Sequence, residues 1–309
     1  MNTRRNFLRH AAGALAFSAV PWSASRGATG GISLGMSLYG MKTLPLTDAL
    51  NTCAKIGYTS VEFALNAGFP TEPKVFTAEA RKAAIAQLQA LKLGLPCVML
   101  NLSLAANDQA HAAALDSLRE TAALVHELVP SNPPMIETVL GGKPAEWEQI
   151  KGKMAERLHS WADTATEAKI AIAIKAHVGS AVNSPERLLW LLDQVKSPAI
   201  SVAYDYSHFE LMGIPMEESM KLLLPHTKFI HVKDTVGEEK KFQFLLPGEG
   251  RTDYVAYFKI LKEHNYTGPV IVEVSAQIFN KPGYDPVAAA TKCFTPLAAA
   301  MEKAGVARI

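Results

Sequence analysis

The hydrophobic positions of this chain form short apolar runs that alternate with longer amphipathic segments. A short apolar run is typical of a buried strand, and apolar residues at the helical period predict a helix in the segment that follows. Residues 109–129 show this period clearly, with Leu115, Leu118, Ala122 and Val125 on one face. The predicted strands cover residues 32–37, 59–64, 95–100, 135–140, 170–176, 200–204, 228–232 and 269–274.

Cap signals mark where several of the predicted helices begin. Thr77 precedes a first turn that contains Glu79, and Ser184 precedes Pro185, a residue suited to the first helical position. The predicted helices cover residues 46–56, 77–91, 109–129, 145–168, 216–224, 254–264 and 286–304, and one more begins at residue 185. Alternating strands and helices predict parallel strands joined by right-handed crossovers.

The number of these units decides the expected architecture. Eight strand–helix units in this length predict an α/β protein with a single closed (β/α)8 barrel, a TIM barrel. An open doubly wound sheet is the alternative. No Gly-x-Gly-x-x-Gly follows the first predicted strand, so the sequence carries no dinucleotide-binding fingerprint. We expect one barrel domain over residues 29–309.

The N-terminal segment differs in pattern from the rest of the chain. Residues 1–30 hold four arginines and no acidic residue, and their apolar run, 11–20, is too short to span a bilayer comfortably. The segment Arg4-Arg5-Asn6-Phe7-Leu8 resembles a twin-arginine export signal. We expect residues 1–28 to be a signal peptide and the mature protein to be periplasmic or secreted, free of the membrane. A basic N-terminal helix that stays attached is the alternative.

Charge and cysteine content exclude some functional classes. The chain has 31 basic and 29 acidic residues, and four of the basic ones lie within residues 1–30, so the remainder is slightly acidic. A slightly acidic domain lacks the basic face that nucleic-acid binding requires, so no nucleic-acid partner is expected. Cys53, Cys97 and Cys293 have neither metal-binding nor redox spacing and are expected to be buried thiols.

Charged side chains and histidines lie at the ends of five predicted strands. In chain order they are Glu62, Lys175, His177, Asp205, His208, His231, Lys233, Asp234 and Glu273. Because the carboxyl ends of barrel strands form one rim, we expect these side chains to converge. Carboxylates and imidazoles together are the donors that divalent cations bind. Taken alone, Asp205 and His208 would more simply be a helix cap and a loop histidine.

Three of these strand ends resemble the sugar phosphate isomerase/epimerase family, which belongs to the xylose isomerase-like barrel superfamily. They are residues 204–208, 230–234 and 270–274, and the loop 246–254 is similar to the Pro-Gly-x-Gly loop of these proteins. The superfamily includes ketose 3-epimerases, inosose dehydratase and AP endonucleases. The resemblance implies a small-molecule carbohydrate or cyclitol substrate. It also implies that the protein could form a homo-oligomer.

The resemblance further implies a divalent metal ion, Mn²⁺, Mg²⁺ or Co²⁺, held by residues at the ends of strands five to eight. Asp205, His231 and Glu273 match three of the four ligand positions, but Lys175 stands where the epimerases have a glutamate. An ammonium group cannot be a ligand and repels a cation. His177 lies in a run that resembles the inosose dehydratase branch, and the resemblance implies that it contacts the metal or the substrate.

Three interpretations of Lys175 remain open at this point. His177, which faces the same side of the strand, could replace the missing ligand. Lys175 could instead be catalytic, as a proton shuttle whose pKa a neighbouring cation lowers. It could also pair with Glu273 in a site that holds no metal.

These observations together predict an exported enzyme that performs metal-assisted proton transfer next to a carbonyl, with Glu273 as the base. Substrate contacts are expected from Glu62, His177, His208, Lys233 and Arg251. An isomerase or epimerase is the first expectation, and a dehydratase of the inosose dehydratase type is the second. A non-catalytic sugar-binding barrel that has lost its metal is the alternative from another class.

Overall fold

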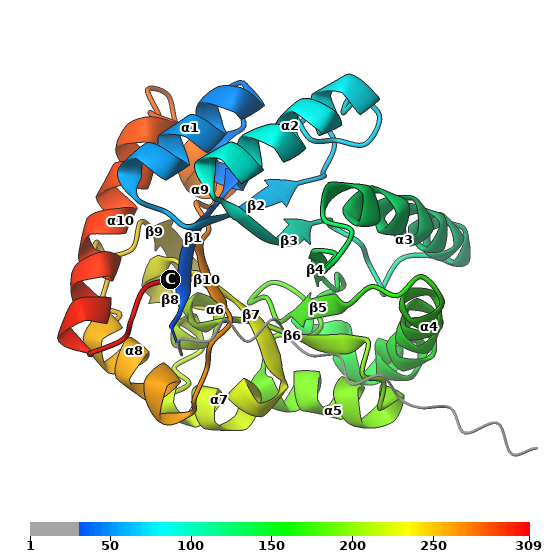
Figure 1. The fold of residues 1–309 in the computed structure, drawn as a ribbon. Coiled ribbons are helices and arrows are strands. Elements are labelled where there is room, and N and C mark those ends of the chain that lie inside the picture. The colour runs from blue at the N-terminus through cyan, green and yellow to red at the C-terminus, as the bar shows by residue number, and fades with distance from the viewer. Residues whose placement is uncertain (1–30) are drawn as a thin grey trace, which may run out of the picture.

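A computed structural model describes residues 31–309, so the predicted export signal, residues 1–28, lies outside the described part of the chain. Eight parallel strands close into a barrel in the order β1-β10-β7-β6-β5-β4-β3-β2, with the helices around the outside (Figure 1). The strands are β1 Ser33–Ser37, β2 Ser60–Ala64, β3 Gly94–Met99, β4 Met135–Val139, β5 Ile172–Lys175, β6 Ile200–Asp205, β7 Thr227–Val232 and β10 Pro269–Val272. The (β/α)8 barrel predicted from the alternating pattern is therefore confirmed.

The helices begin where the sequence signals place them. Thr77 accepts a hydrogen bond from the Ala80 N–H at the start of α2, and Ser184 caps α5 in the same way. The outer helices are α1 Leu46–Ile56, α2 Ala78–Leu91, α3 Asp108–Leu128, α4 Trp147–Glu167, α5 Pro185–Val195, α7 Met216–Leu223, α8 Tyr254–Glu263 and α10 Pro286–Lys303. Within residues 31–309, no helix is both long enough and apolar enough to cross a membrane.

The barrel closes where β1 pairs with both β2 and β10. Gly35 aligns with Ser60 on one side and with Ile271 on the other. A Cβ atom at Gly35 would lie 2.3 Å from the side chains of both neighbours, so this close approach of three strands requires glycine.

The interior of the barrel has an apolar layer beneath a polar one. Cys97, Ala173, Ala203, Phe229 and Ile271 form a separate buried cluster. Because side chains on a strand alternate between faces, the residue two positions further along each strand also points into the barrel. That step leads from Ala173 to Lys175 and brings the charged residues together at the carboxyl ends of the strands. Cys53, Cys97 and Cys293 are all buried and unpaired, as predicted.

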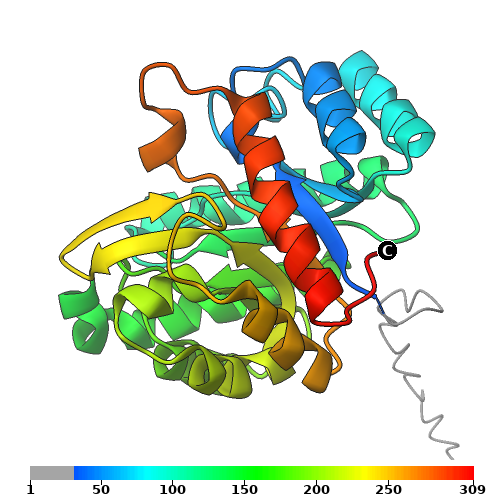
Figure 2. The same ribbon diagram turned by 90° about the vertical axis from the view of Figure 1, so that its left-hand side faces the viewer.

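The segment after β7 forms a β-hairpin, whereas the sequence pattern predicts a loop there. Its strands are β8 Asp234–Glu238 and β9 Lys241–Leu245, which pair antiparallel. The hairpin, yellow in Figure 2, lies at the same end of the barrel as the short helix α9 Ala276–Phe279. A hydrogen bond from the Phe244 N–H to Gln277 Oε1 joins the two. A further short helix, α6 Tyr206–Leu211, begins directly after β6.

Candidate active site

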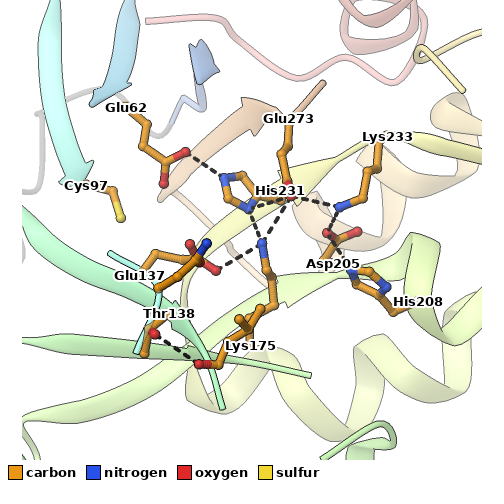
Figure 3. A network of polar contacts seen from close by, with 12 residues as sticks. Glu62, Cys97, Glu137, Thr138, Lys175, Asp205, His208, His231, Lys233 and Glu273 are labelled. Atoms are coloured by element: carbon orange, nitrogen blue, oxygen red, sulfur yellow. Dashed lines mark hydrogen bonds and ion pairs between the residues drawn. The ribbon is translucent and has the colours of Figure 1, made fainter. Parts of the chain in front are cut away.

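Six charged or imidazole side chains form the polar layer at the carboxyl end of the barrel (Figure 3). They come from β2, β4, β5, β6, β7 and the residue just after β10, and they are Glu62, Glu137, Lys175, Asp205, His231 and Glu273. Glu273 is the most exposed of the six, at 9%. Charged groups removed from water to this degree are costly unless they pair with one another. Their contacts therefore determine what the site can do.

The ammonium group of Lys175 lies at the centre of the network. Its Nζ atom is 3.0 Å from Glu137 Oε1, 3.1 Å from Glu273 Oε2 and 3.0 Å from His231 Nδ1. Burial alone would lower the pKa of Lys175, but Glu137 and Glu273 raise it well above its usual range. This direction is opposite to the lowered pKa expected of a proton shuttle, because carboxylates contact this lysine, and a catalytic role for Lys175 stays a prediction. The predicted pairing with Glu273 is present.

Lys233 provides a second ammonium group from the residue that follows β7. It forms a hydrogen-bonded ion pair with Asp205 Oδ2 and lies 2.7 Å from Glu273 Oε2. The ring of Phe244, from the β8–β9 hairpin, lies 5.1 Å from its Nζ atom and covers it. Among the described residues these two carboxylates are the hydrogen-bond acceptors of Lys233, which leaves one N–H group available for another acceptor.

His231 is oriented by Glu62. The Nε2–H group donates to Glu62 Oε2 at 2.9 Å, so the lone pair is assigned to Nδ1, which faces Lys175 Nζ and lies 3.2 Å from Glu273 Oε2. A carboxylate that fixes one imidazole nitrogen in this way directs the other toward the centre of the site. Glu62 thus orients His231 and is fully buried in the barrel. Its predicted contact with a substrate stays a prediction.

The two oxygens of Asp205 have different partners. Oδ1 accepts hydrogen bonds from the Ser207 N–H and hydroxyl groups, at 3.2 and 2.6 Å, and so caps α6. Oδ2 pairs with Lys233 and lies 3.4 Å from His208 Nε2. Burial would raise the pKa of Asp205, but Lys233 and His208 hold it well below its usual range. The helix-cap role predicted for this residue is therefore present, on Oδ1, whereas its role as a metal ligand stays a prediction.

His177 and His208 stack side by side above the network. Their ring centroids are 4.3 Å apart, His208 Nδ1 accepts from the Val178 N–H, and His177 Nδ1 accepts from the Gly179 N–H at 3.0 Å. Burial and the neighbouring His208 lower the pKa of His177 to about 2, so the ring is neutral. His177 lies outside the cluster of metal-type donors, and its Nε2–H can donate to a hydroxyl group.

Arg251 belongs to a different set of contacts from the other predicted residues. Its side chain is about half exposed, and its Nε atom lies 3.4 Å from Glu210 Oε1. It also donates to the Glu210 and Gly237 carbonyl oxygens. Arg251 therefore fastens the hairpin to α6, and a direct contact between it and a substrate stays a prediction.

Two residues that the sequence analysis did not assign lie in or beside the network. Glu137 pairs with Lys175, and its pKa is raised, chiefly by burial. Tyr39, just after β1, stacks on Phe69 at 5.2 Å, and its pKa is raised by burial and by the negative charge of Glu273. Glu137 lies within β4 and Tyr39 just after β1, and a polar side chain in or next to a barrel strand was the available signal.

A family model described as "Xylose isomerase-like TIM barrel" matches residues 50–294, which include every residue of the network described above except Tyr39. The chain belongs to the xylose isomerase-like TIM barrel family. Among curated proteins, it is 29% identical over 146 residues to an inosose dehydratase of Bacillus anthracis, a match that covers 42% of this chain and 49% of the relative. The chain thus spans about half the length of the curated relatives that it matches.

Solved structures of the family share the fold at low sequence identity. The 3-keto-D-glucoside 4-epimerase of E. coli superimposes with a TM-score of 0.70 at 12% identity, over 87% of this chain and 99% of its own. The IOLI protein, whose structure contains a zinc atom, gives 0.71 at 18% identity, over 89% and 98%. At these identities the likeness shows the fold alone.

The family resemblance raises the question of whether a divalent metal fits this site. Asp205, His231 and Glu273 each offer one ligand atom, and these atoms lie within 4.8 Å of one another, so by donor type the cluster could hold a metal ion. The same donors already contact the ammonium groups of Lys175 and Lys233. A metal at a bonding distance of about 2.0–2.3 Å would lie against both cations. The residues present therefore do not fit a divalent metal unless the lysines are displaced.

Replacing Lys175 by Met is expected to destabilise the protein by about 3–5 kcal/mol, because Glu137 and Glu273 would then share a buried site without their central cation. Urea unfolding at neutral pH measures the loss. The double variant K175M/E137Q removes one of the stranded carboxylates and is expected to recover part of the stability. A loss below about 1 kcal/mol in K175M, the range of an exposed ion pair, would contradict the central place of Lys175.

Proposed function

We propose that this protein is an enzyme that removes a proton from the carbon next to the carbonyl group of a keto-sugar or ketocyclitol. The observation that carries the proposal is the position of Glu273. Burial would raise its pKa, but Lys175 and Lys233 hold it well below the usual range, so the carboxylate is ionised at the rim of the barrel. An ionised carboxylate can accept a proton, and a neighbouring N–H donor can stabilise the oxyanion that forms.

The first step uses two groups of the site. Glu273 takes the proton, and the electrons of the broken C–H bond form a C=C bond while those of the C=O bond move onto the carbonyl oxygen. The free N–H of Lys233 donates to this oxygen, since its other two partners are Asp205 and Glu273. His177 and Tyr39 line the rim, where they can bind substrate hydroxyl groups.

For the step that follows, we propose loss of a β-hydroxyl group as water. Glu273 gives its proton to the leaving oxygen, and the oxyanion re-forms the carbonyl. The electrons of the enolate C=C bond form a new C=C bond between the α and β carbons as the C–O bond at the β carbon breaks, and the carboxylate is regenerated. One acid–base group is enough for this syn elimination. The curated relatives, inosose dehydratases, favour this outcome.

Isomerisation is the second candidate, because moving a proton between adjacent carbons also needs only one carboxylate. Epimerisation is less well supported, because it requires a second acid–base group on the opposite face of the carbon. The strand-five position, where the epimerases have a glutamate, holds Lys175, which forms ion pairs with Glu137 and Glu273 and contacts His231.

The test is ¹H NMR and mass spectrometry of keto-sugars and inososes incubated with the protein in D₂O. Loss of water supports the dehydratase, whereas deuterium next to the carbonyl without loss of water supports an isomerase or epimerase. If no compound exchanges or reacts, although calorimetry shows that one binds, the protein is a sugar-binding barrel and the proposal fails.

We also propose that the protein is exported in a folded state to the periplasm or beyond. The support is the Arg4-Arg5 pair and the apolar run that follows it. Cell fractionation of the R4K/R5K variant tests this, since retention in the cytoplasm is expected and unchanged export would contradict it.

A further inference from the structure

We propose that the Lys175 ammonium group takes the place of the divalent metal ion in this site, so that the protein works without a metal. The part of this proposal that concerns turnover rests on the proposed function. The part that concerns metal binding stands on the geometry alone.

The position of Lys175 supports this proposal. The Lys175 Nζ atom lies 3.0 Å from His231 Nδ1 and 3.1 Å from Glu273 Oε2, which are two of the three metal-type donors. The lone pair of His231 points at this nitrogen because Glu62 fixes the opposite side of the ring. The ammonium thus contacts two of the three donor residues that a metal ion would use.

The charge of the buried cluster also supports the proposal. Lysine in place of glutamate at position 175 changes the charge of the cluster by two units, the charge of one divalent cation. The remaining buried carboxylates are Glu62, Glu137, Asp205 and Glu273. Lys175 pairs with Glu137 and Glu273, and Lys233 pairs with Asp205 and Glu273, so the two cations offset part of the negative charge that would attract a metal.

The contacts of Lys175 and Lys233 give the two lysines different chemical roles. Lys175 donates to Glu273, contacts His231 Nδ1 and forms an ion pair with Glu137, so it orients Glu273 and His231 and is a positioning residue. Lys233 retains one free N–H group, and Phe244 shields it from solvent. Lys233 is therefore the group that stabilises the oxyanion. A hydrogen bond that is shielded from solvent is strong when it points at a developing negative charge.

The experiment compares Zn²⁺ and Mn²⁺ binding by the wild-type protein, K175E and K175M, by calorimetry and by metal analysis after dialysis. The wild type is expected to retain less than about a tenth of an equivalent, and K175E about one equivalent, because a glutamate then supplies a fourth metal-type donor in place of the cation. K175M removes the charge without adding a ligand and is expected to bind more weakly than K175E. Circular dichroism establishes that each variant is folded.

Two results would overturn the inference. One is a wild-type protein that binds about one equivalent of metal as tightly as K175E. The other is a folded K175E that binds none. If K175E does not fold, the wild-type titration alone decides. These readouts do not depend on turnover, so a protein without keto-sugar chemistry would still give a clear result for the metal.

Discussion

Glu273→Gln is expected to lower the rate of proton exchange by about 10²–10⁴-fold, the contribution typical of a positioned general base, while the fold stays intact. Glutamine keeps an oxygen that can accept from Lys175 and Lys233, but it has no negative charge and cannot take the proton. The exchange rate is measured by ¹H NMR with the best compound of the substrate panel.

The matched control for this variant is Glu137→Gln. Glu137 pairs with the same lysine and is 1% exposed, compared with 9% for Glu273. It is expected to lose less than about tenfold in rate, since it does not contact the reacting carbon. Equal losses in the two variants would mean that the network acts only as a scaffold and that Glu273 is not the base.

Lys233→Met is expected to lower kcat by about 10²–10³-fold, with a smaller change in KM. The reason is that its hydrogen bond to the substrate oxygen becomes stronger as the negative charge develops on that oxygen. Steady-state kinetics separates the two constants, and K233R, which keeps an N–H donor and the charge, is expected to recover part of kcat.

Stability must be controlled in this experiment, because Lys233 also neutralises Asp205. The double variant K233M/D205N removes the stranded charge and is expected to regain stability but not turnover. A rise in KM with unchanged kcat would contradict the assignment, because it would show that Lys233 binds the substrate and the transition state equally well.

Much of the site could be predicted because strand alternation is visible in one sequence. Ala203 and Asp205 lie two positions apart on β6, and the same step leads from Phe229 to His231 on β7. An apolar residue followed two positions later by a charged one at a strand end is enough to place the polar layer above the apolar layer.

The charge state of Lys175 could not be predicted in this way. Its pKa depends on Glu137, 38 positions earlier in the chain, and on Glu273, 98 positions later, which contact it only after the barrel has closed. The interpretation of Lys175 as a proton shuttle assumed a neighbouring cation and therefore a lowered pKa. The carboxylates that contact the lysine raise its pKa instead. The hairpin was missed for a local reason, since the charged run 238–241 hides the alternation of Phe242 and Phe244.

We propose that Glu273 and two lysines perform proton transfer without a metal ion. The most direct test is the rate of proton exchange next to the carbonyl, measured by NMR in D₂O for the wild-type protein after dialysis against EDTA. The rate is expected to stay within about twofold of the untreated value and not to rise when Mn²⁺ is added. Exchange that stops after dialysis and returns with Mn²⁺ would contradict the account.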